Sequence, residues 1–222
     1  MSKKIYINPG HSDVDPGAVG YETERKLNVT TANYMNAYLL ANYDCQTKVT
    51  AGSVNSTATV AAEANSWGAD LLVSIHNNAG GGDGYEALVY STKNKDLGQI
   101  FEKHVKAAGQ NSRGVKYRPD LGVLRRTNMP AILNEGAFVD NLKDVQDWND
   151  DAELKVLGEA YAKAAAEYLG LEKKTVEPVP VPEKEYIYRV QVGAYSKKSG
   201  ADAMLAELRA AGFGGIIVKS EK

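Results

Sequence analysis

The sequence predicts an α/β protein: an open, mostly parallel twisted sheet with helices on both faces. Short apolar runs alternate with segments of helical periodicity, which is the order that parallel strands and crossover helices produce. One run, residues 70–76 (DLLVSIH), is apolar at positions that face both sides of a strand, as expected where helices cover each face. A Pro-rich segment then precedes a shorter βαβ-like pattern, so we expect a second, small C-terminal unit.

The elements follow in order from local patterns. Residues 5–8 form the first apolar run and predict a strand. Residues 24–41 place Leu27, Thr31 and Tyr34 on one face at helical spacing and predict a helix. By the same criteria we expect further helices at residues 57–67, 97–108 and 152–169, and further strands at residues 70–76, 85–90, 122–125 and 131–135.

The composition changes after the last long helix. Three of the seven prolines lie in residues 178–182, flanked by Glu and Lys, which is typical of an extended spacer. We therefore predict a first domain at residues 1–171, a Pro/Glu/Lys-rich linker at residues 172–185 and a small unit at residues 186–222. Within the small unit we expect a strand at 186–195, a helix at 200–211 ended by Gly212, and a strand at 215–219.

Charge and cysteine content exclude several classes of protein. The chain has 26 Lys and Arg against 28 Asp and Glu, a net charge of −2, so it has no overall basic field to hold nucleic acid or an anionic membrane. We expect neither as a partner. The single cysteine, Cys45, cannot form an intramolecular disulfide, and no apolar run approaches the length of a transmembrane helix.

Polar side chains stand where predicted strands end. His11 follows the first strand, His76 closes the strand at 70–76, and Glu135 closes the strand at 131–135. Because the carboxyl ends of parallel strands meet at one edge of a sheet, these side chains are expected to lie close together. Glu24, at the start of a helix, can point back toward the same edge.

Two imidazoles and one carboxylate form a known ligand set for a catalytic zinc ion, with the fourth position left to water. His11, Glu24 and His76 fit this set for one Zn²⁺, although Glu22 competes with Glu24 and spacing alone does not choose between them. Glu135 then remains as the carboxylate that takes a proton from the water. The expected reaction is metal-assisted hydrolysis of an amide or ester.

Structural interpretations of these residues stay open at this point. A histidine that closes a buried strand can be a hydrogen-bonded structural residue, and a glutamate at a helix start can serve the helix dipole. The spacing His11-x-Asp13-x-Asp15 could hold Mg²⁺ or Mn²⁺, but Asp15 also opens a turn with Pro16 and Gly17, so this set ranks lower.

Two further features are interpreted as structural. His104 is expected on a helix surface. The glycines of residues 80–84 lack the Gly-Lys-Ser/Thr ending of a phosphate loop and precede a strand, so we expect a flexible loop beside the site.

Several ordered motifs together resemble a known family. They are NPGH at 8–11, DPGA at 15–18, ERKLN at 24–28, SIHNNA at 74–79, VLR at 123–125 and MPAIL at 129–133, leading into Glu135. Residues 1 to about 170 resemble the type-3 zinc N-acetylmuramoyl-L-alanine amidases, which cleave peptidoglycan between N-acetylmuramic acid and the L-alanine of the stem peptide.

The resemblance implies specific roles. It places the zinc ligands at His11, Glu24 and His76, which decides for Glu24 over Glu22, and it places the catalytic acid at Glu135. Asn78 and Arg125 match recurring family positions and are tentative substrate-binding residues, with a loop-fixing amide and a strand-end ion pair as their structural alternatives. The chain departs from the family pattern at Asn8, at Ser12 and Asp13, and at Gly136 and Ala137, none of which is a ligand.

The small C-terminal unit resembles one repeat of the sporulation-related (SPOR) module that binds peptidoglycan glycan strands. The matching residues include YRVQVGAY at 188–195 and Gly212-Phe213. Because the usual module has two such repeats, the resemblance implies pairing with a second copy in a homodimer through residues 186–222, or a vestigial wall-binding segment. A poorly ordered basic tail is the structural alternative.

Taken together, these interpretations predict a cell-wall lytic enzyme of the endolysin or autolysin type, whose partner is peptidoglycan through stem peptide and glycan strand. The N-terminus shows no signal-peptide pattern, so we expect synthesis in the cytoplasm and action on the wall after lysis or holin-type release. Two other functions remain as alternatives: a non-catalytic peptidoglycan-binding protein, and a zinc peptidase that cuts within the stem peptide.

Overall fold

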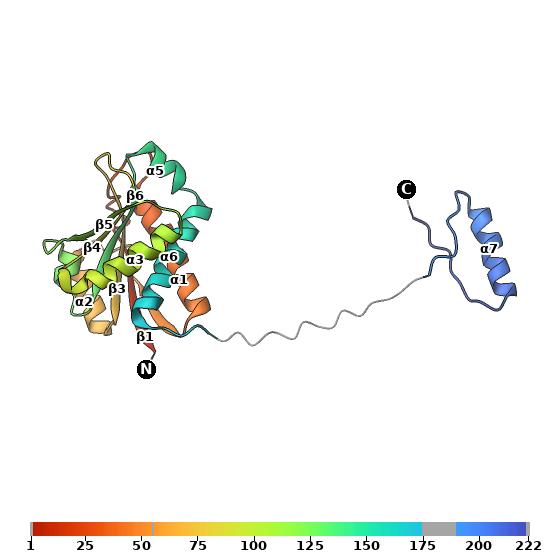
Figure 1. Cartoon of the computed structure of the whole chain (residues 1–222), viewed down its shortest axis with the longest axis horizontal. Coiled ribbons are helices and arrows are strands. Elements are labelled where there is room, and N and C mark those ends of the chain that lie inside the picture. Colours follow the sequence, from red (N-terminus) through yellow and green to blue (C-terminus); the bar gives the residue numbers. More distant parts are fainter. Residues whose placement is uncertain (1, 55, 175–189, 221–222) are drawn as a thin grey trace. The chain divides into compact units, whose positions relative to one another are not determined.

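The structure is a computed structural model that describes residues 2–54, 56–174 and 190–220. The chain divides into two compact units, residues 1–175 and residues 176–222 (Figure 1). Residues 171–174 still belong to the first unit, because the Lys174 amide donates to the Asn42 carbonyl and Lys173 forms a β-bridge with Tyr43. None of the helices in the described residues has the length and apolar character needed to cross a bilayer.

A six-stranded sheet forms the centre of the first unit, in the order β2-β1-β3-β6-β4-β5. The strands β2, β1, β3 and β6 run parallel, whereas β4 runs antiparallel to β6, and β5 runs parallel to β4. Their bounds are β1 Lys3–Pro9, β2 Cys45–Val49, β3 Leu71–Asn78, β4 Tyr85–Val89, β5 Ser112–Tyr117 and β6 Ala131–Phe138. The predicted open, mostly parallel sheet is therefore confirmed.

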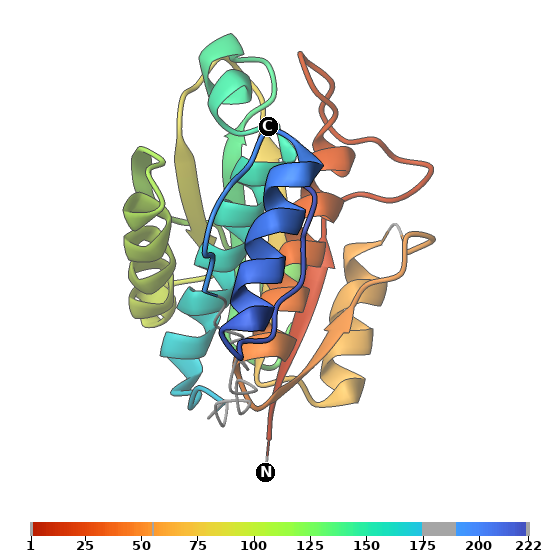
Figure 2. The same ribbon diagram turned by 90° about the vertical axis from the view of Figure 1, so that its right-hand side faces the viewer.

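Helices cover the two faces unequally (Figures 1 and 2). The long helices α1 (Glu24–Asn42), α3 (Lys95–Ala107) and α6 (Asp151–Leu169) pack on one face around Met35, Phe101 and Tyr161. The other face carries only α2 (Thr57–Trp67) and the four-residue α4 (Gly122–Arg125), packed over Leu72, Leu88 and Leu133. The remaining elements of this unit are a 3₁₀ turn at Thr92–Asn94 and α5 at Leu142–Asp147.

Several predicted boundaries and elements differ from the structure. Residues 122–125 form the helical turn α4 instead of a strand. The amides of Arg125 and Arg126 donate to the carbonyls of Leu121 and Gly122, and this turn places both Val123 and Leu124 in the core beside Leu72. The sequence analysis did not find β2, β5 or α5. The first two are edge strands whose polar sequences, CQTKV and SRGVKY, resemble loops.

The second unit contains one helix, α7 (Lys198–Ala210), close to the prediction and followed by Gly212 in a left-handed conformation. The segments 190–195 and 215–219, predicted as strands, form no β-ladder in the described residues. Residues 175–185 of the predicted linker and residues 186–189 of the first predicted strand lie outside the described residues.

Candidate active site

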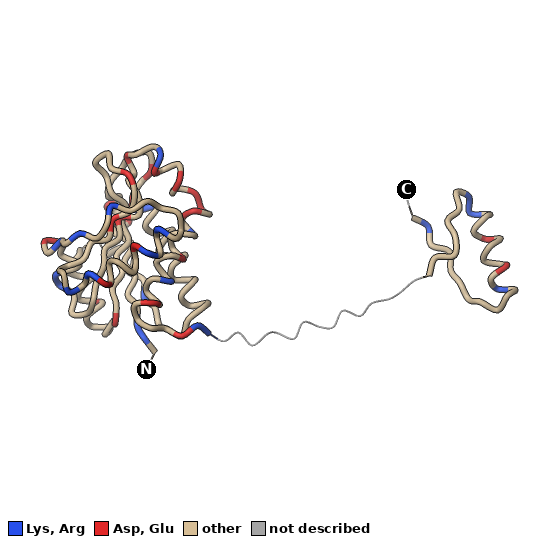
Figure 3. The backbone as a smooth tube through the Cα atoms, in the orientation of Figure 1, with Lys and Arg blue, Asp and Glu red and all other residues tan. Residues whose placement is uncertain are grey.

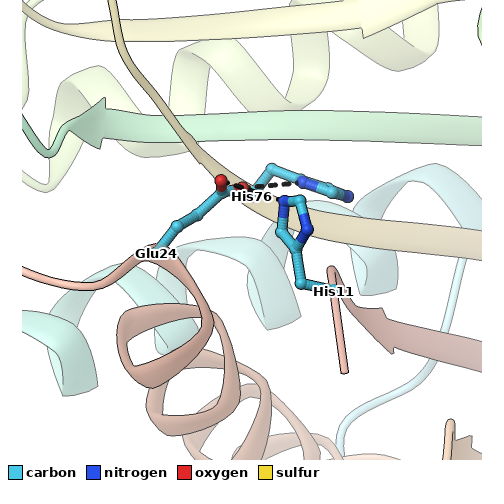
Figure 4. Close-up of side chains that lie close together, drawn as sticks. All are labelled: His11, Glu24 and His76. Atoms are coloured by element: carbon cyan, nitrogen blue, oxygen red, sulfur yellow. Dashed lines mark hydrogen bonds and ion pairs between the residues drawn. The ribbon is translucent and has the colours of Figure 1, made fainter. Parts of the chain in front are cut away.

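Three chain segments bring His11, Glu24 and His76 together at the carboxyl edge of the parallel strands (Figure 4). His11 follows β1, Glu24 is the first residue of α1, and His76 lies near the end of β3. One potential ligand atom from each residue lies within 4.8 Å of the others. Two imidazoles and one carboxylate at this separation provide donors of the kind that zinc prefers. Figure 2 shows the loop between β1 and α1 extending beyond this edge of the sheet.

The backbone around these ligands leaves no space for additional side-chain atoms. A Cβ at Gly10 would lie 2.2 Å from the His76 ring, and a Cβ at Gly17 would lie 2.5 Å from the His11 ring. His11 itself has φ 65°, in the left-handed region that residues other than glycine rarely adopt. The position of the His11 ring beside the other two ligands therefore requires an unfavourable backbone conformation at His11.

Glu24 is the centre of the hydrogen-bond network. Its Oε2 lies 2.9 Å from His11 Nε2, and its Oε1 lies 2.9 Å from His76 Nδ1. The backbone amide of Ala18 donates to Oε2, and that of Asn77 donates to Oε1. Burial acts to raise the pKa of Glu24, but hydrogen bonds with the two imidazoles outweigh burial and keep this pKa far below its usual range. Glu24 is therefore ionised and ready to bind a cation.

His11 lies between two carboxylates. Its Nε2 contacts Glu24, and its Nδ1 lies 3.0 Å from Oδ2 of Asp15. The pKa of His11 is raised to about 9, mainly by the hydrogen bond with Glu24 and further by that with Asp15, while burial acts in the opposite direction. Asp15 also accepts from the Gly17 amide, so the predicted turn and the contact with His11 are both present. The sequence analysis had weighed Asp15 as a turn residue and as a lower-ranked ligand for Mg²⁺ or Mn²⁺, and had not predicted that it would orient His11.

Glu135 lies on β6 directly opposite His76 of β3. Its Oε2 atom is buried and has no hydrogen-bond partner in the described residues. Burial raises the pKa of Glu135 to about 7; the charges of Glu24 and Glu86 add to this effect, and that of His76 opposes it. A carboxyl group with a pKa near neutrality can both accept and donate a proton under ordinary conditions.

Asn78 and Arg125, the two tentative substrate-binding residues, have different surroundings. Asn78 lies beside the site, where its Nδ2 donates to Oε2 of Glu86 at 3.4 Å. Arg125 is exposed at the end of α4, on the side of the sheet that carries Glu135, and its side chain makes no hydrogen bond or ion pair with the described residues. The alternative of a strand-end ion pair for Arg125 is therefore wrong.

The rival ligands and the residues interpreted as structural do not belong to the group formed by His11, Glu24 and His76. Glu22 pairs with Lys26, and His104 on α3 pairs with Glu167 of α6. Asp13 is mostly exposed and pairs with Arg25. The glycine loop 80–84 is held more firmly than expected, because Asp140 accepts from its first two amides and Asp144 accepts from its last.

The sequence analysis also missed an acidic residue next to Glu135. Glu86 of β4 is opposite Glu135 in the antiparallel pair β4–β6, and its side chain is only 7% exposed. Burial acts to raise the pKa of Glu86, but Lys116 and Arg113 of β5 outweigh burial and lower it. An acid inside the apolar pattern YEALV was the available signal, but its two cationic partners come from a strand that was not predicted.

The sequence matches two family models. One, described as N-acetylmuramoyl-L-alanine amidase, covers residues 5–167, and the other, described as SPOR domain, covers residues 158–219. The second match begins within α6, so its first part falls on the first compact unit.

Individual relatives agree with these matches. The N-acetylmuramoyl-L-alanine amidase CwlM of Bacillus licheniformis is 32% identical over 225 residues, which cover 97% of this chain and 84% of CwlM. The endolysin of Bacillus phage SPP1 is 33% identical over 196 residues, covering 82% of this chain and 72% of the endolysin. The crystal structure of an N-acetylmuramoyl-L-alanine amidase from Clostridium difficile 630 superposes with a TM-score of 0.72 at 27% identity, covering 76% of this chain and 97% of that one.

Proposed function

The chain belongs to the N-acetylmuramoyl-L-alanine amidase family, and on that basis we propose that it hydrolyses the bond between N-acetylmuramic acid and L-alanine in peptidoglycan with the help of one zinc ion. The convergence of His11, Glu24 and His76 carries this proposal, because three donor atoms of the right chemistry meet from three separate segments of the chain. The wall polymer is the partner, and we propose that the enzyme acts at the cell wall.

The residues present fit a zinc ion. His11 and His76 would each give one ring nitrogen and Glu24 one carboxylate oxygen, while Asp15 would hold the other nitrogen of His11 and so fix the orientation of its ring. When bound, zinc supplies Lewis acidity, which lowers the pKa of a water molecule and polarises a carbonyl group.

Glu135 is the proposed proton carrier. Its unpaired Oε2 and its pKa of about 7 allow it to take a proton from the attacking water and to deliver that proton to the leaving amine of L-alanine. The C–N bond of the amide breaks, and the carbonyl carbon acquires the hydroxyl of the water. The amide and one water molecule therefore yield a carboxylic acid and an amine, and no further reactant is needed.

Release of dye from labelled peptidoglycan tests the role of the metal. We expect clearing by the full chain, loss of clearing after treatment with a chelator, and recovery when zinc is added back. Clearing that a chelator does not affect would refute the zinc mechanism, and absence of clearing with zinc present would favour the non-catalytic binding protein. End-group analysis separates the third function: an amidase frees the amino group of L-alanine, whereas a stem-peptide peptidase frees other amino termini.

We also propose that the C-terminal unit attaches the enzyme to the wall. Support comes from the SPOR match and from apolar side chains on either side of α7 that are exposed and available for contact. They are Val190, Val192, Phe213, Ile216 and Val218. Removing residues 176–222 leaves the contacts of residues 171–174 in place and is expected to weaken co-sedimentation with sacculi. Hydrolysis of soluble muramyl peptides should continue, and equal sedimentation of both forms would exclude the attachment role.

The same exposed side chains support pairing of two chains through the C-terminal unit. Val190 is 91% and Ile216 84% exposed, which is unusual for apolar residues in a folded unit. We expect the full chain to form a dimer in sedimentation experiments and the form that lacks residues 176–222 to be a monomer. A monomeric full chain at concentrations well above those used in assays would refute this pairing.

A further inference from the structure

A polar network adjoins Glu135 on the far side from the zinc ligands. Glu135 is two residues beyond Leu133 on β6, and Glu86 is two residues before Leu88 on β4, so both acids lie on the face that α2 and α4 cover only in part. Asn78 reaches Glu86 from β3. The network thus runs from the end of β3, across β6, to the outer strands.

Two cations complete the network. Arg113 Nε and Lys116 Nζ of β5 each lie 2.5 Å from the same oxygen, Oε1 of Glu86. Glu86 is 7% exposed, whereas each cationic side chain is 42% exposed. One buried negative charge therefore holds two half-exposed positive charges, and the cluster presents a net positive charge to solvent.

The Arg113 side chain has free hydrogen-bond donors whose orientation is set by its contacts with the protein. In the part of the chain that the structure describes, the Arg113 guanidinium donates to the protein through Nε alone, which leaves the two terminal NH₂ groups available. The guanidinium lies over the ring of Phe138, 5.2 Å from its centroid, and this contact fixes its plane. A planar pair of NH₂ groups beside an ammonium matches the two oxygens of a carboxylate.

The next basic residue after β5 is less available than this pair. Arg118, the next basic residue after β5, donates Nε to one oxygen of Asp120 and Nη2 to the other, at 2.9 and 2.7 Å. Acidic residues dominate the segment around α5 and the start of α6 in the same unit (Figure 3). Among these groups, the pair on β5 combines a net positive charge with free donors and proximity to Glu135.

The separation of the cations from Glu135 fits a short peptide. β5 lies two strands from β6, which corresponds to about 10 Å at the usual spacing between strands. An extended chain covers about 3.3–3.6 Å per residue, so this distance is bridged by roughly two to three residues.

We propose that Arg113 and Lys116 bind a carboxylate of the peptidoglycan stem peptide, two to three residues beyond the scissile amide. The inference rests on the proposed amidase function, because it assigns the leaving-group side of that substrate to β4 and β5. Glu86 is a positioning residue that holds both cations, and it does not touch the substrate. The two sources of the carboxylate are the second and the third residue of the stem peptide.

Four soluble muramyl tripeptides distinguish these sources. One has free carboxylates at the second and third residues, two have one of the carboxylates amidated, and the fourth has both amidated. For the full zinc-loaded chain we expect a KM about tenfold lower for substrates that keep the recognised carboxylate than for the doubly amidated one. In the variant Arg113→Gln/Lys116→Gln this difference is expected to disappear.

Controls separate recognition from folding and from charge. Removing both cations leaves Glu86 buried without a cationic partner and with only the Asn78 amide as hydrogen-bond donor. The triple variant with Glu86→Gln should therefore be measured in parallel, and it should also lose the preference. Lys103→Gln is the matched control, because Lys103 on α3 likewise lies 2.5 Å from a glutamate oxygen, that of Glu167, but away from the site. It should keep the preference of the unmodified chain.

The outcomes are distinct. Equal KM values of the unmodified chain for all four substrates would overturn the inference and leave the amidase function intact. A preference that persists in both the double and the triple variant would do the same. Failure of the unmodified chain to cleave any of the four with zinc present would instead refute the proposed function, and the inference with it.

Discussion

Replacing Glu135 with Gln is expected to stabilise the metal-free protein at pH 8 while removing turnover. In the unfolded chain, a glutamate ionises near its ordinary pKa of 4.5, whereas in the folded protein burial delays ionisation to about pH 7. Above pH 7 the folded protein must hold a negative charge beside the anions Glu24 and Glu86. Gln has nearly the same shape and no charge, so the variant escapes this cost.

The size of the effect follows from the two pKa values. Their difference corresponds to about 3 kcal/mol at most, and we expect roughly 2 kcal/mol after the surroundings of the charge have relaxed. The two pKa values also give the direction in which the stability of the unmodified protein changes with pH. Below pH 4.5 the carboxyl is protonated in both states and costs nothing; between pH 4.5 and 7 only the unfolded chain loses the proton, so stability falls; above pH 7 the full cost remains.

Urea unfolding of chelator-treated protein measures this difference. The free energy of unfolding of the unmodified chain and of Glu135→Gln should be compared at pH 8 and at pH 4.5. The other titrating groups are common to both proteins, so their contributions largely cancel. Zinc-loaded samples of the same two proteins give the rates, and loss of the proton carrier is expected to lower turnover by about 100-fold or more.

A Glu135→Gln variant that is less stable than the unmodified chain at pH 8, or a stability difference that is the same at both pH values, would refute this prediction. Either result would mean that Glu135 is not held in a strongly desolvated position. Normal turnover by the variant would remove Glu135 from the reaction, whatever its effect on stability.

Three further predictions concern the zinc ligands. Asp15→Asn should weaken zinc affinity about 10- to 100-fold in a chelator competition because the ring of His11 loses its fixed orientation, whereas Asp13→Asn in the same loop should have little effect. Because the pKa of His11 is about 9 without metal, zinc uptake at pH 7 should release about one proton from it, and calorimetry in buffers of different ionisation enthalpy would contradict this by finding none. Gly10→Ala should abolish zinc retention on dialysis, since its Cβ would overlap the ring of His76, and a variant with full zinc content would disprove that packing argument.

Much of the fold was predictable because its central elements have strong periodicity. Residues 71–73 and Ile75 are apolar and form the buried centre of β3, and α2 matches its prediction at both ends. The edge strands β2 and β5 were not predictable in this way, since one side of each faces solvent and their sequences are polar. For residues 122–125 the local pattern was too short to distinguish a strand from a helical turn.

Some residues of the candidate site were predictable from the sequence, and others were not. His11, His76 and Glu135 could be placed together from topology alone, because parallel strands bring their carboxyl ends to one edge. The roles of Asp15 and Glu86 depend on contacts across loops and on the antiparallel direction of β4, which brings the start of β4 and β5 to the same edge. The local sequence marks both acids as unusual, but it does not show which groups they contact.

The outermost position of β5 has a consequence for how this enzyme could diversify. A strand with a neighbour on one side only tolerates exchange of its side chains, and here that strand is separated by β4 and β6 from the strands that carry the metal ligands. Changes at one or two of its positions could adapt the enzyme to walls whose peptides differ in amidation, while the hydrolytic centre stays as it is. Selectivity and reactivity would then evolve independently within a single sheet.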